Sequence, residues 1–281
     1  MPELPEVETI ARGLDHRVGR DVIESVWLGE KPEPLKSSAG EIVSVLEGSR
    51  IVRVRRVGKH IVFDLERKRQ DGRARQQRAQ WIVHLGMTGR LLIAAPDSQV
   101  LKHTHAVIRL ASGSEVRFVD PRRFGRLAVA RVGVKTGQGF AAPGDEPLES
   151  QIDHFISLFR DRKTPIKSAL LNQKLLSGVG NIYADESLFR AGIRPRRQAA
   201  LLRRDQLRRL HGALQQVLRE AIAAGGSSIS DYVDADGKKG LFQVQHRVYG
   251  REGEPCLVCA TTIKRVIIAS RSSHYCPHCQ H

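Results

Sequence analysis

The spacing of apolar residues in the first half of the chain constrains the fold most strongly. Between residues 22 and 132, short runs rich in β-branched residues follow one another closely, separated by glycine and charged residues. Many short, closely spaced strands are typical of an antiparallel sandwich or barrel. We expect strands in nine runs: VIESVWL (22–28), IVSVLEG (42–48), RIVRVRRV (50–57), HIVFDLE (60–66), QWIVHLG (80–86), RLLIAA (90–95), HAVIRLA (105–111), EVRFVD (115–120) and RLAVARV (126–132).

Helical spacing surrounds this β-rich region. In residues 5–19, apolar side chains recur every three or four positions, and Pro5 suits the first turn of a helix, where its missing N–H costs nothing. The same periodicity returns after residue 149. We expect four further helical runs, DHFISLFRDR (153–162), TPIKSALLNQKLL (164–176), NIYADESLFRAG (181–192) and the long run from 204 to 226.

One segment lies between the β-rich region and the later helical region, and another interrupts the β-rich region. Residues 133–149 are rich in Gly and Pro and are expected to be a linker, and residues 66–80 have almost no apolar residue and are expected to be a solvated loop. The chain is therefore predicted to be an α+β multidomain protein. Its parts are an N-terminal β domain, a sandwich or a barrel, with a leading helix (1–132), the linker (133–149), a helical domain (150–240) and a small C-terminal module (241–281).

The C-terminal module contains all four cysteines of the chain. They form two Cys-x2-Cys pairs, and the sixteen residues between the pairs fit a hairpin. Such pairs can surround one zinc ion with four thiolates, which fills the coordination sphere and makes the site structural. Two disulfides or four free thiols are the alternatives, and clustering in a reducing cytosol favours the metal. The predicted ligands are Cys256, Cys259, Cys276 and Cys279.

The charge of the chain indicates a polyanionic partner. Lys and Arg number 46 against 30 Asp and Glu, a formal net charge of +16. Nucleic acid is the simplest such partner; a soluble basic protein without one is the alternative. An anionic membrane is less favoured, because no apolar run approaches the roughly 20 residues that a bilayer span needs. The N-terminus also lacks the pattern of a secretory signal, so we expect a cytoplasmic protein.

Gly178 and Gly180 stand directly before a predicted helix that opens at Asn181. Small residues at a helix N-terminus let backbone N–H groups approach a phosphate, and the helix dipole adds to the attraction. The alternative is a glycine turn with Asn181 as a simple helix cap. Lysines nearby, including Lys163 and Lys167, favour a phosphate of DNA.

Pro2 and Glu3 form a chemically capable pair if the initiator methionine is removed. A secondary amine that condenses with a sugar aldehyde gives an iminium ion, which is cationic without a proton and acts as an electron sink. Glu3 is adjacent and could transfer protons at the sugar. The alternative is an inert terminus.

Several motifs follow one another along the chain: PELPEVET (2–9), HLGMTGR (84–90), DPRRFGR (120–126), GVGNIYADESLFRAGIRP (178–195), VYGREGEPC (248–256) and the final cysteine pairs. Taken together, they resemble the formamidopyrimidine-DNA glycosylase family nearly from end to end. The related endonuclease VIII branch shares the architecture, but its N-terminus usually reads Pro-Glu-Gly-Pro-Glu, and PELPEVE is similar to the purine-lesion branch.

The resemblance implies an activity and a fold. The implied activity is a DNA glycosylase and AP lyase of base-excision repair that removes oxidised purines and cleaves the strand by β,δ-elimination. The implied fold has a β-sandwich, a helix–two-turn–helix domain and a zinc finger. It further implies a monomer that acts on damaged double-stranded DNA with one zinc ion and no small-molecule cofactor. A pyrimidine-preferring, endonuclease VIII-like enzyme and a noncatalytic zinc-dependent damaged-DNA-binding protein remain alternatives.

The resemblance also assigns catalytic roles. Pro2 would attack C1′ of the damaged nucleotide, and Glu3 would act as acid and base at the sugar. Lys59 matches a lysine that assists catalysis and elimination. Arg271 matches the zinc-finger arginine that grips phosphates beside the lesion. Residues 227–240 resemble a segment that closes over the extruded base.

Further residues match DNA contacts of the family. Asn181 matches a phosphate-binding asparagine. Met87, Arg122 and Phe124 match three side chains that fill the space left by the extruded base. His103, Arg122 and either Arg162 or Lys167 align with additional contacts.

Overall fold

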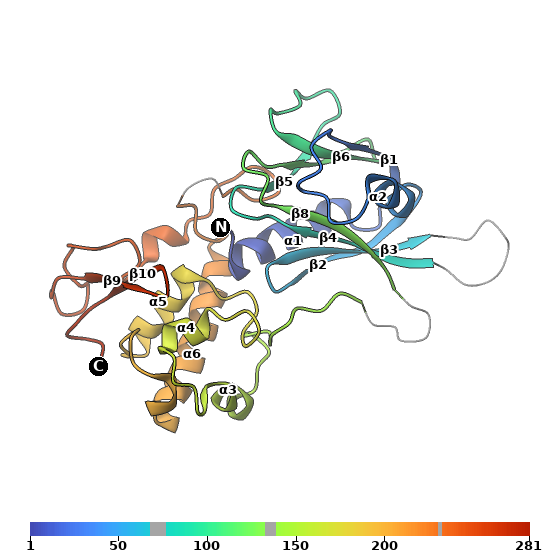
Figure 1. Cartoon of the computed structure of the whole chain (residues 1–281). Coiled ribbons are helices and arrows are strands. Elements are labelled where there is room, and N and C mark those ends of the chain that lie inside the picture. The colour runs from blue at the N-terminus through green and yellow to red at the C-terminus, as the bar shows by residue number, and fades with distance from the viewer. Residues whose placement is uncertain (68–76, 133–138, 230–231) are drawn as a thin grey trace. The chain divides into compact units, whose positions relative to one another are not determined.

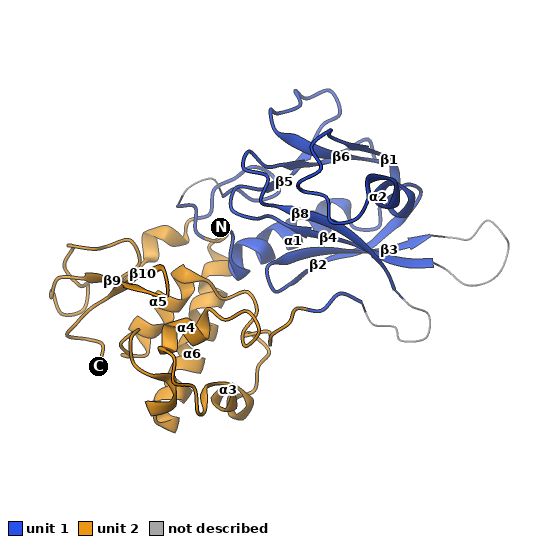
Figure 2. Ribbon diagram, viewed as in Figure 1, with its two compact units in different colours: residues 1–141, 227–240 blue, residues 142–226, 241–281 orange. Residues whose placement is uncertain are grey.

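The computed structural model describes residues 1–67, 77–132, 139–229 and 232–281, which form two compact units (Figure 2). The first unit comprises residues 1–141 and 227–240, and the second comprises residues 142–226 and 241–281. The described residues of 227–240, expected in the helical domain, thus belong to the first unit. Residues 133–138 of the expected linker lie outside the described residues.

The first unit contains two four-stranded antiparallel sheets (Figure 1), with strand orders β1-β6-β7-β5 and β2-β3-β4-β8. Phe63 and Trp81 from one sheet and Val116 and Phe118 from the other belong to a single buried core, so the predicted sandwich is confirmed. The strands are β1 (Ile23–Leu28), β2 (Arg50–Val57), β3 (His60–Arg67), β4 (Gln77–His84), β5 (Arg90–Ala94), β6 (Thr104–Leu110), β7 (Glu115–Val119) and β8 (Arg126–Arg131).

The leading helix α1 (Leu4–Val18) matches the helix expected at 5–19. Its buried face carries Val7, Ile10, Leu14 and Val18, which join the core of the sandwich. Packing of this apolar face stabilises the helix more than its own propensity does. The helix therefore anchors the first residues of the chain to the first unit.

One of the nine expected strands is wrong, because residues 42–48 contribute to a helix, α2 (Ala39–Leu46). The Ser38 hydroxyl caps this helix by accepting a hydrogen bond from the Glu41 N–H at 3.3 Å. Ile42, Val45 and Leu46 are buried together, and their i, i+3, i+4 spacing is helical. The β-branched residues of the run favoured a strand, although the helical spacing and the serine that precedes the run both indicate a helix.

The loop expected at 66–80 is shorter than predicted. Strand β3 continues to Arg67 and β4 begins at Gln77, with Glu66 paired to Arg78 in the ladder. The remainder of the expected loop, residues 68–76, lies outside the described residues. Polar composition misled here because antiparallel strands can carry polar side chains that face solvent, as the exposed Gln77 and Arg78 do.

The second unit is helical and ends in a two-stranded hairpin (Figure 1). Helix α5 is buried from Ile182 to Phe189 and packs against α6 and β10. The helix expected at 164–176 is confined to α4, after which the Gln173 amide donates to the carbonyls of Leu171 and Val179 and holds a turn. The elements are α3 (Ile152–Phe159), α4 (Ile166–Leu170), α5 (Asn181–Arg190), α6 (Arg204–Ala223), β9 (Lys264–Ile268), β10 (Arg271–Tyr275) and the short 3₁₀ turns Ala199–Leu201 and Phe242–Gln245.

Candidate active site and nucleic-acid interface

Pro2 and Glu3 are held in place at the start of α1. Glu3 is the N-cap residue, and its backbone N–H donates to the Glu6 carboxylate at 2.8 Å. Pro2 is buried and Glu3 is 5% exposed, while Met1, which precedes them, is 53% exposed. These residues therefore have a defined position, in contrast to a terminus that frays.

The same Glu6 carboxylate ties a distant segment to α1. Its second oxygen accepts the backbone N–H of Ser227 at 2.8 Å, and Glu6 is almost completely buried. Further along, the carbonyl of Ala235 accepts the backbone N–H of Ile93 in β5 at 2.9 Å. Burial and the nearby Glu6 charge raise the pKa of Tyr232 above its usual range. The described part of 227–240 thus packs beside the leading helix.

Lys59 lies in the turn between β2 and β3 and is half-buried. The guanidinium of Arg56 donates to Glu8 in α1 at 2.8 Å and to the carbonyl of Gly58 at 3.2 Å. This bridge links the residue before Lys59 to the helix that begins after Glu3. The ion pair between Arg56 and Glu8 therefore connects the turn that carries Lys59 to α1.

Two histidines beside this turn are neutral near pH 7. The rings of His60 and His84 lie 4.9 Å apart. Burial lowers the pKa of His60; it also lowers that of His84 to about 4, with contributions from His60, Arg126 and Lys59. Neutral His84 can then accept the backbone N–H of Gly86 at its Nδ1 atom, at 3.1 Å.

Met87, Arg122 and Phe124 project from two turns of the first unit. Met87 is 43% exposed and Phe124 is 52% exposed, although both side chains are apolar. The Arg122 guanidinium lies 4.8 Å from the centre of the Phe124 ring, a cation–π distance. Exposed apolar side chains of this size are candidates for contact with a ligand.

In the second unit, Asn181 is the first residue of α5, as expected, and Gly180 rather than Asn181 occupies the N-cap position. The Asn181 amide donates to the carbonyl of Ser272 at 3.0 Å. Gly178 adopts a positive φ of 87°, and its N–H donates to the Gln173 side chain at 3.0 Å. The glycine turn is therefore fixed, and Asn181 is tied to the residue that follows Arg271.

Lys167 is fully buried, which argues against the DNA contact expected for it. Its ammonium lies 2.7 Å from the Asp185 carboxylate and donates to the Ser272 carbonyl at 2.6 Å. Asp185 is also fully buried, and it accepts the backbone N–H of His274 at 2.9 Å. A buried lysine requires such a partner. Lys167 and Asp185 thus connect α4 and α5 to strand β10.

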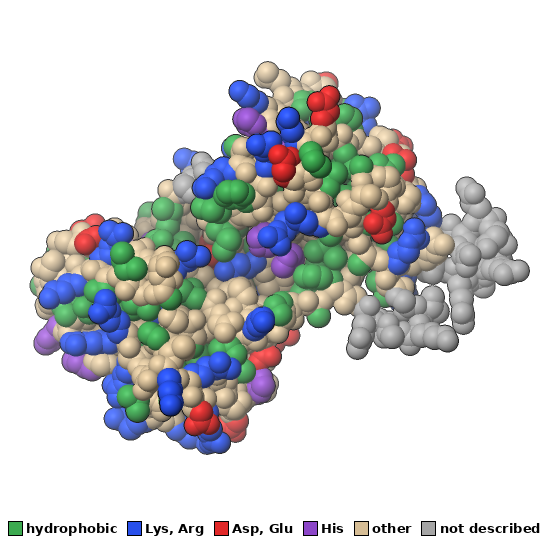
Figure 3. All heavy atoms as spheres, viewed as in Figure 1, with side chains coloured by type: hydrophobic (Ala, Val, Ile, Leu, Met, Phe, Trp, Pro, Cys, Tyr) green, Lys and Arg blue, Asp and Glu red, His purple; other side chains and the backbone are tan. Residues whose placement is uncertain are grey.

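The remaining expected DNA contacts are at the surface of their units. His103 is exposed and adopts a positive φ of 68°. Arg162 is exposed, and its Nε donates to the Leu158 carbonyl. Arg271 is exposed at the start of β10. Lys and Arg side chains are frequent on the face seen in Figure 3 and acidic side chains are fewer, in agreement with the net charge of +16.

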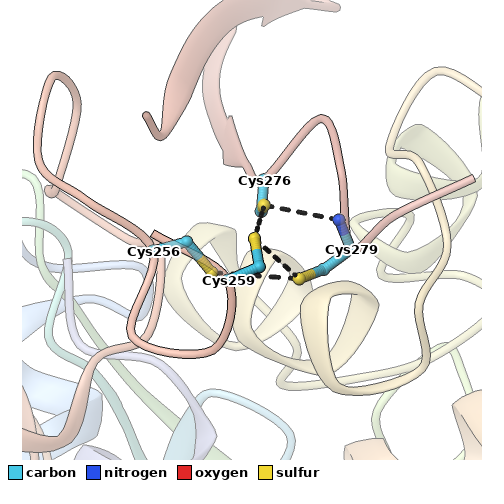
Figure 4. Close-up of side chains that lie close together, drawn as sticks. All are labelled: Cys256, Cys259, Cys276 and Cys279. Atoms are coloured by element: carbon cyan, nitrogen blue, oxygen red, sulfur yellow. Dashed lines mark hydrogen bonds between the residues drawn. The ribbon is translucent and has the colours of Figure 1, made fainter. Parts of the chain in front are cut away.

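The side chains of the four cysteines converge between the two Cys-x2-Cys pairs (Figure 4). Their sulfur atoms all lie within 4.8 Å of one another, with separations of 3.4 Å for Cys259–Cys276 and 3.9 Å for Cys256–Cys279. Four thiolates at about 2.3 Å from one tetrahedral zinc ion would be about 3.8 Å apart. The geometry fits zinc, and the β9–β10 hairpin between the pairs is the predicted one.

Three family models match successive parts of the chain. The formamidopyrimidine-DNA glycosylase N-terminal domain matches residues 1–127, the H2TH domain of the same enzymes matches residues 143–233, and a zinc finger found in FPG and IleRS matches residues 253–281. Together these matches cover most of the sequence, in family order. The chain belongs to the formamidopyrimidine-DNA glycosylase family.

Curated relatives and solved structures agree with this membership. The formamidopyrimidine-DNA glycosylase of Solibacter usitatus is 46% identical over 281 residues, covering 100% of this chain and 99% of the relative. The MutM (Fpg) protein of Thermus thermophilus is 39% identical, with a TM-score of 0.82 and coverage of 99% and 98%. A Lactococcus lactis Fpg mutant in complex with DNA containing Fapy-dG is 31% identical, with a TM-score of 0.87 and full coverage of both chains.

Membership of the formamidopyrimidine-DNA glycosylase family identifies the metal as well. The matched zinc finger includes all four clustered cysteines, so the chain holds one structural zinc ion through Cys256, Cys259, Cys276 and Cys279. Among the residues that the structure describes, no helix is long and apolar enough to span a lipid bilayer.

Proposed function

We propose that this protein acts on damaged double-stranded DNA as a glycosylase and AP lyase of base-excision repair. Its substrates are oxidised purines such as 8-oxoguanine and formamidopyrimidines. The observation that carries the proposal is the fixed Pro2–Glu3 pair, held at the start of α1 by the Glu6 carboxylate. The family match favours this function over a pyrimidine-preferring enzyme and over a noncatalytic DNA-binding protein.

Pro2 is the proposed nucleophile, after removal of Met1. Its nitrogen forms a bond to C1′ while the glycosidic bond breaks, and the base leaves with a proton. The amine loses its own proton and the sugar ring opens, which gives an iminium ion. This ion withdraws electrons and acidifies the C2′ hydrogen. Removal of that hydrogen expels the 3′ phosphate, and loss of the C4′ hydrogen then expels the 5′ phosphate. Water hydrolyses the iminium bond, which releases the sugar fragment as an unsaturated aldehyde, frees Pro2 and leaves a one-nucleotide gap.

Glu3 and Lys59 are the proposed proton-transfer groups. Glu3 directly follows the nucleophile and is 5% exposed, so its carboxylate acts in a largely water-excluded place. Lys59 lies in a turn bridged to α1 through Arg56 and Glu8. This bridge supports a role for Lys59 in the same reaction.

The second unit is proposed to grip the phosphates beside the lesion through Asn181 and Arg271. The Ser272 carbonyl receives hydrogen bonds from Asn181 and from Lys167, and it adjoins Arg271 in the chain. We therefore revise the role of Lys167 from a DNA contact to a residue that positions the zinc hairpin. Arg162 and His103 are retained as proposed DNA contacts because both are exposed.

Met87, Arg122 and Phe124 are the proposed occupants of the space left by the extruded base. An extruded base costs a few kcal/mol of stacking and pairing. Apolar side chains at 43% and 52% exposure can recover part of this cost when they enter the stack. We propose that Arg122 hydrogen-bonds the orphaned partner base.

We further propose that the protein is a cytoplasmic monomer that needs no small-molecule cofactor. We also propose four functional parts: the catalytic β-sandwich domain (1–132), the linker (133–149), the helical DNA-binding domain (150–240) and the zinc finger (241–281). Residues 227–240, at the end of the third part, are proposed to act with the first unit, to which they belong structurally. Sedimentation of the complete chain, free and bound to a lesion duplex, tests the monomer. A dimer in either sample would contradict it.

Borohydride trapping tests the catalytic proposal. The reductant converts the iminium ion into a stable amine, so only a catalytic nitrogen becomes cross-linked to DNA. We expect the processed protein to be trapped on an 8-oxoguanine duplex and on an abasic duplex. Pro2→Gly and a form that retains Met1 should not be trapped efficiently. Efficient trapping of either one would contradict the role of Pro2.

Glu3→Gln serves as the matched variant in the same assay. It should lose base release from the 8-oxoguanine duplex, because the proton-transfer group is missing. It should still be trapped on the abasic duplex, where the aldehyde already exists. Unchanged base release would remove Glu3 from the mechanism. Parallel excision assays on an oxidised-pyrimidine duplex decide between the purine and pyrimidine branches.

A further inference from the structure

We infer that Asp120 is a positioning residue that holds Met87, Arg122 and Phe124 together on the first unit. The inference rests on the proposed function, in which these three side chains fill the space left by the extruded base. It concerns the carboxylate beneath them, which contacts the turns that carry them.

The topology of the sandwich brings the two turns side by side. Strands β4 and β8 are neighbours in one sheet, where His84 pairs with Arg126, and β5 and β7 are neighbours in the other, where Arg90 pairs with Val119. The chain passes from the first sheet to the second through residues 85–89. It returns through residues 120–125, so the two crossings lie at the same end of the sandwich.

The backbones of these crossings are in direct contact. Gly86 has a positive φ of 63°, and a Cβ there would lie 2.5 Å from the carbonyl carbon of Phe124 and 2.6 Å from the nitrogen of Gly125. Only glycine permits this approach. Met87 therefore directly follows Gly86, the residue at which the backbones of the two crossings are in contact.

The Asp120 carboxylate binds both crossings. One oxygen accepts hydrogen bonds from the Thr88 hydroxyl at 2.6 Å and from the backbone N–H of Arg122 at 3.2 Å. The other oxygen accepts the backbone N–H of Gly125 at 2.7 Å. Thr88 follows Met87, and Gly125 follows Phe124. One carboxylate therefore bonds at, or next to, each of the three proposed void-filling residues.

Asp120 is also held firmly itself. Its side chain is fully buried, its backbone N–H donates to the His103 carbonyl at 3.0 Å, and its carbonyl oxygen lies 2.9 Å from the His105 ring nitrogen. A buried carboxylate is costly unless donors satisfy it. Here the donors come from the two turns, so the position of the turns is coupled to the position of the carboxylate.

Support of the core is the competing explanation for Asp120, and the exposures of its neighbours distinguish the two. Met87 and Phe124 are exposed rather than packed inside, so their placement adds little to the core. The Thr88 hydroxyl supplies the bond from the first crossing. Removal of this hydroxyl alone loosens Met87 and leaves the Arg122 and Gly125 bonds to the carboxylate in place.

The test compares Thr88→Val with Thr88→Ser in the complete, zinc-loaded and processed protein. Valine has the shape of threonine without the hydroxyl, whereas serine keeps it. Single-turnover rates are measured on an 8-oxoguanine duplex and on a duplex with a preformed abasic site. The thermal unfolding midpoint of each variant is recorded alongside.

For Thr88→Val we expect 8-oxoguanine excision to fall by about tenfold, the effect of one lost hydrogen bond. Cleavage of the abasic duplex should fall much less, because no base has to be extruded there. Thr88→Ser should restore excision. Asp120→Asn should reduce excision at least as much as Thr88→Val, because an amide cannot accept all three bonds.

Three outcomes would overturn the inference. Excision unchanged in a folded Thr88→Val protein would show that the link is unimportant. An equal loss on both duplexes with a lowered midpoint would assign Thr88 and Asp120 to stability alone. Failure of the unsubstituted protein on both duplexes would overturn the proposed function itself, and it is distinguishable because it requires no variant.

Discussion

Lys167 carries its charge inside the second unit, where Asp185 balances it and the Ser272 carbonyl accepts a hydrogen bond from it. The partners are 18 and 105 positions away in sequence. The ammonium and the carboxylate are both fully buried. At such a site the loss of one partner leaves an uncompensated charge, which is far costlier than loss of the pair.

Lys167→Met should therefore destabilise the second unit by about 3–5 kcal/mol and weaken DNA binding, because strand β10 loses a support beside Arg271. Chemical unfolding and binding to a lesion duplex are the measurements. Lys163→Met, which removes an exposed lysine, is the matched control and should change stability little. Wild-type stability in Lys167→Met would remove the positioning role.

The residues that act by chemistry were the most predictable from the sequence. The spacing of the four cysteines indicates a tetrahedral site by itself, and the zinc finger is confirmed. The roles of Pro2 and Glu3 follow from their order and stay predictions. Glu6, Asp120 and Asp185 were missed, because a buried carboxylate is recognised by its partners and each of these has a partner far away in sequence: Ser227, Thr88 and His274 respectively. Their only local signal is an acidic residue within a motif that matches the family.

At the scale of elements, alternation identified eight of the nine expected strands, and the error at 42–48 has a local cause. Its β-branched residues favour a strand, but Ser38 caps a helix and Ile42, Val45 and Leu46 bury one helical face. Tertiary packing overrides weak propensity in such runs. The two crossings between the sheets, residues 85–89 and 120–125, could not be predicted, because alternation does not show which strands are neighbours.

The zinc hairpin depends on its metal, because its own core is small. Phe189, Val248 and Ile263 pack with the cysteines in one cluster. We expect chelation of zinc to release β9 and β10, since binding energy at such sites is folding energy. Affinity for a lesion duplex should then fall, and zinc, but not magnesium, should restore it.

Circular dichroism of the chelated protein and fluorescence anisotropy with labelled DNA are the measurements. The first unit contains none of the ligands, so its sandwich should stay folded in the chelated sample. Full DNA affinity without zinc would contradict the proposed role of the hairpin in phosphate binding.

At the scale of the whole molecule, the net charge of +16 sets how the protein finds DNA. Each neutralised phosphate releases counterions, so the logarithm of affinity should fall with the logarithm of salt concentration by about 0.9 for each phosphate contact. Arg271→Ala should reduce this slope by about 1. Anisotropy titrations across a range of salt concentrations measure both, and an affinity independent of salt would contradict phosphate binding.

The chain leaves the first unit after residue 141 and returns to it only at residue 227. Glu6, made among the first residues, receives the Ser227 N–H from a position 221 residues later. At about 5–20 residues per second, a ribosome needs roughly 10 to 45 seconds to cover that interval. During that time the whole helical segment from residue 142 to residue 226 is made before the sandwich receives its last segment. The nascent enzyme therefore completes the surroundings of its first residues almost last.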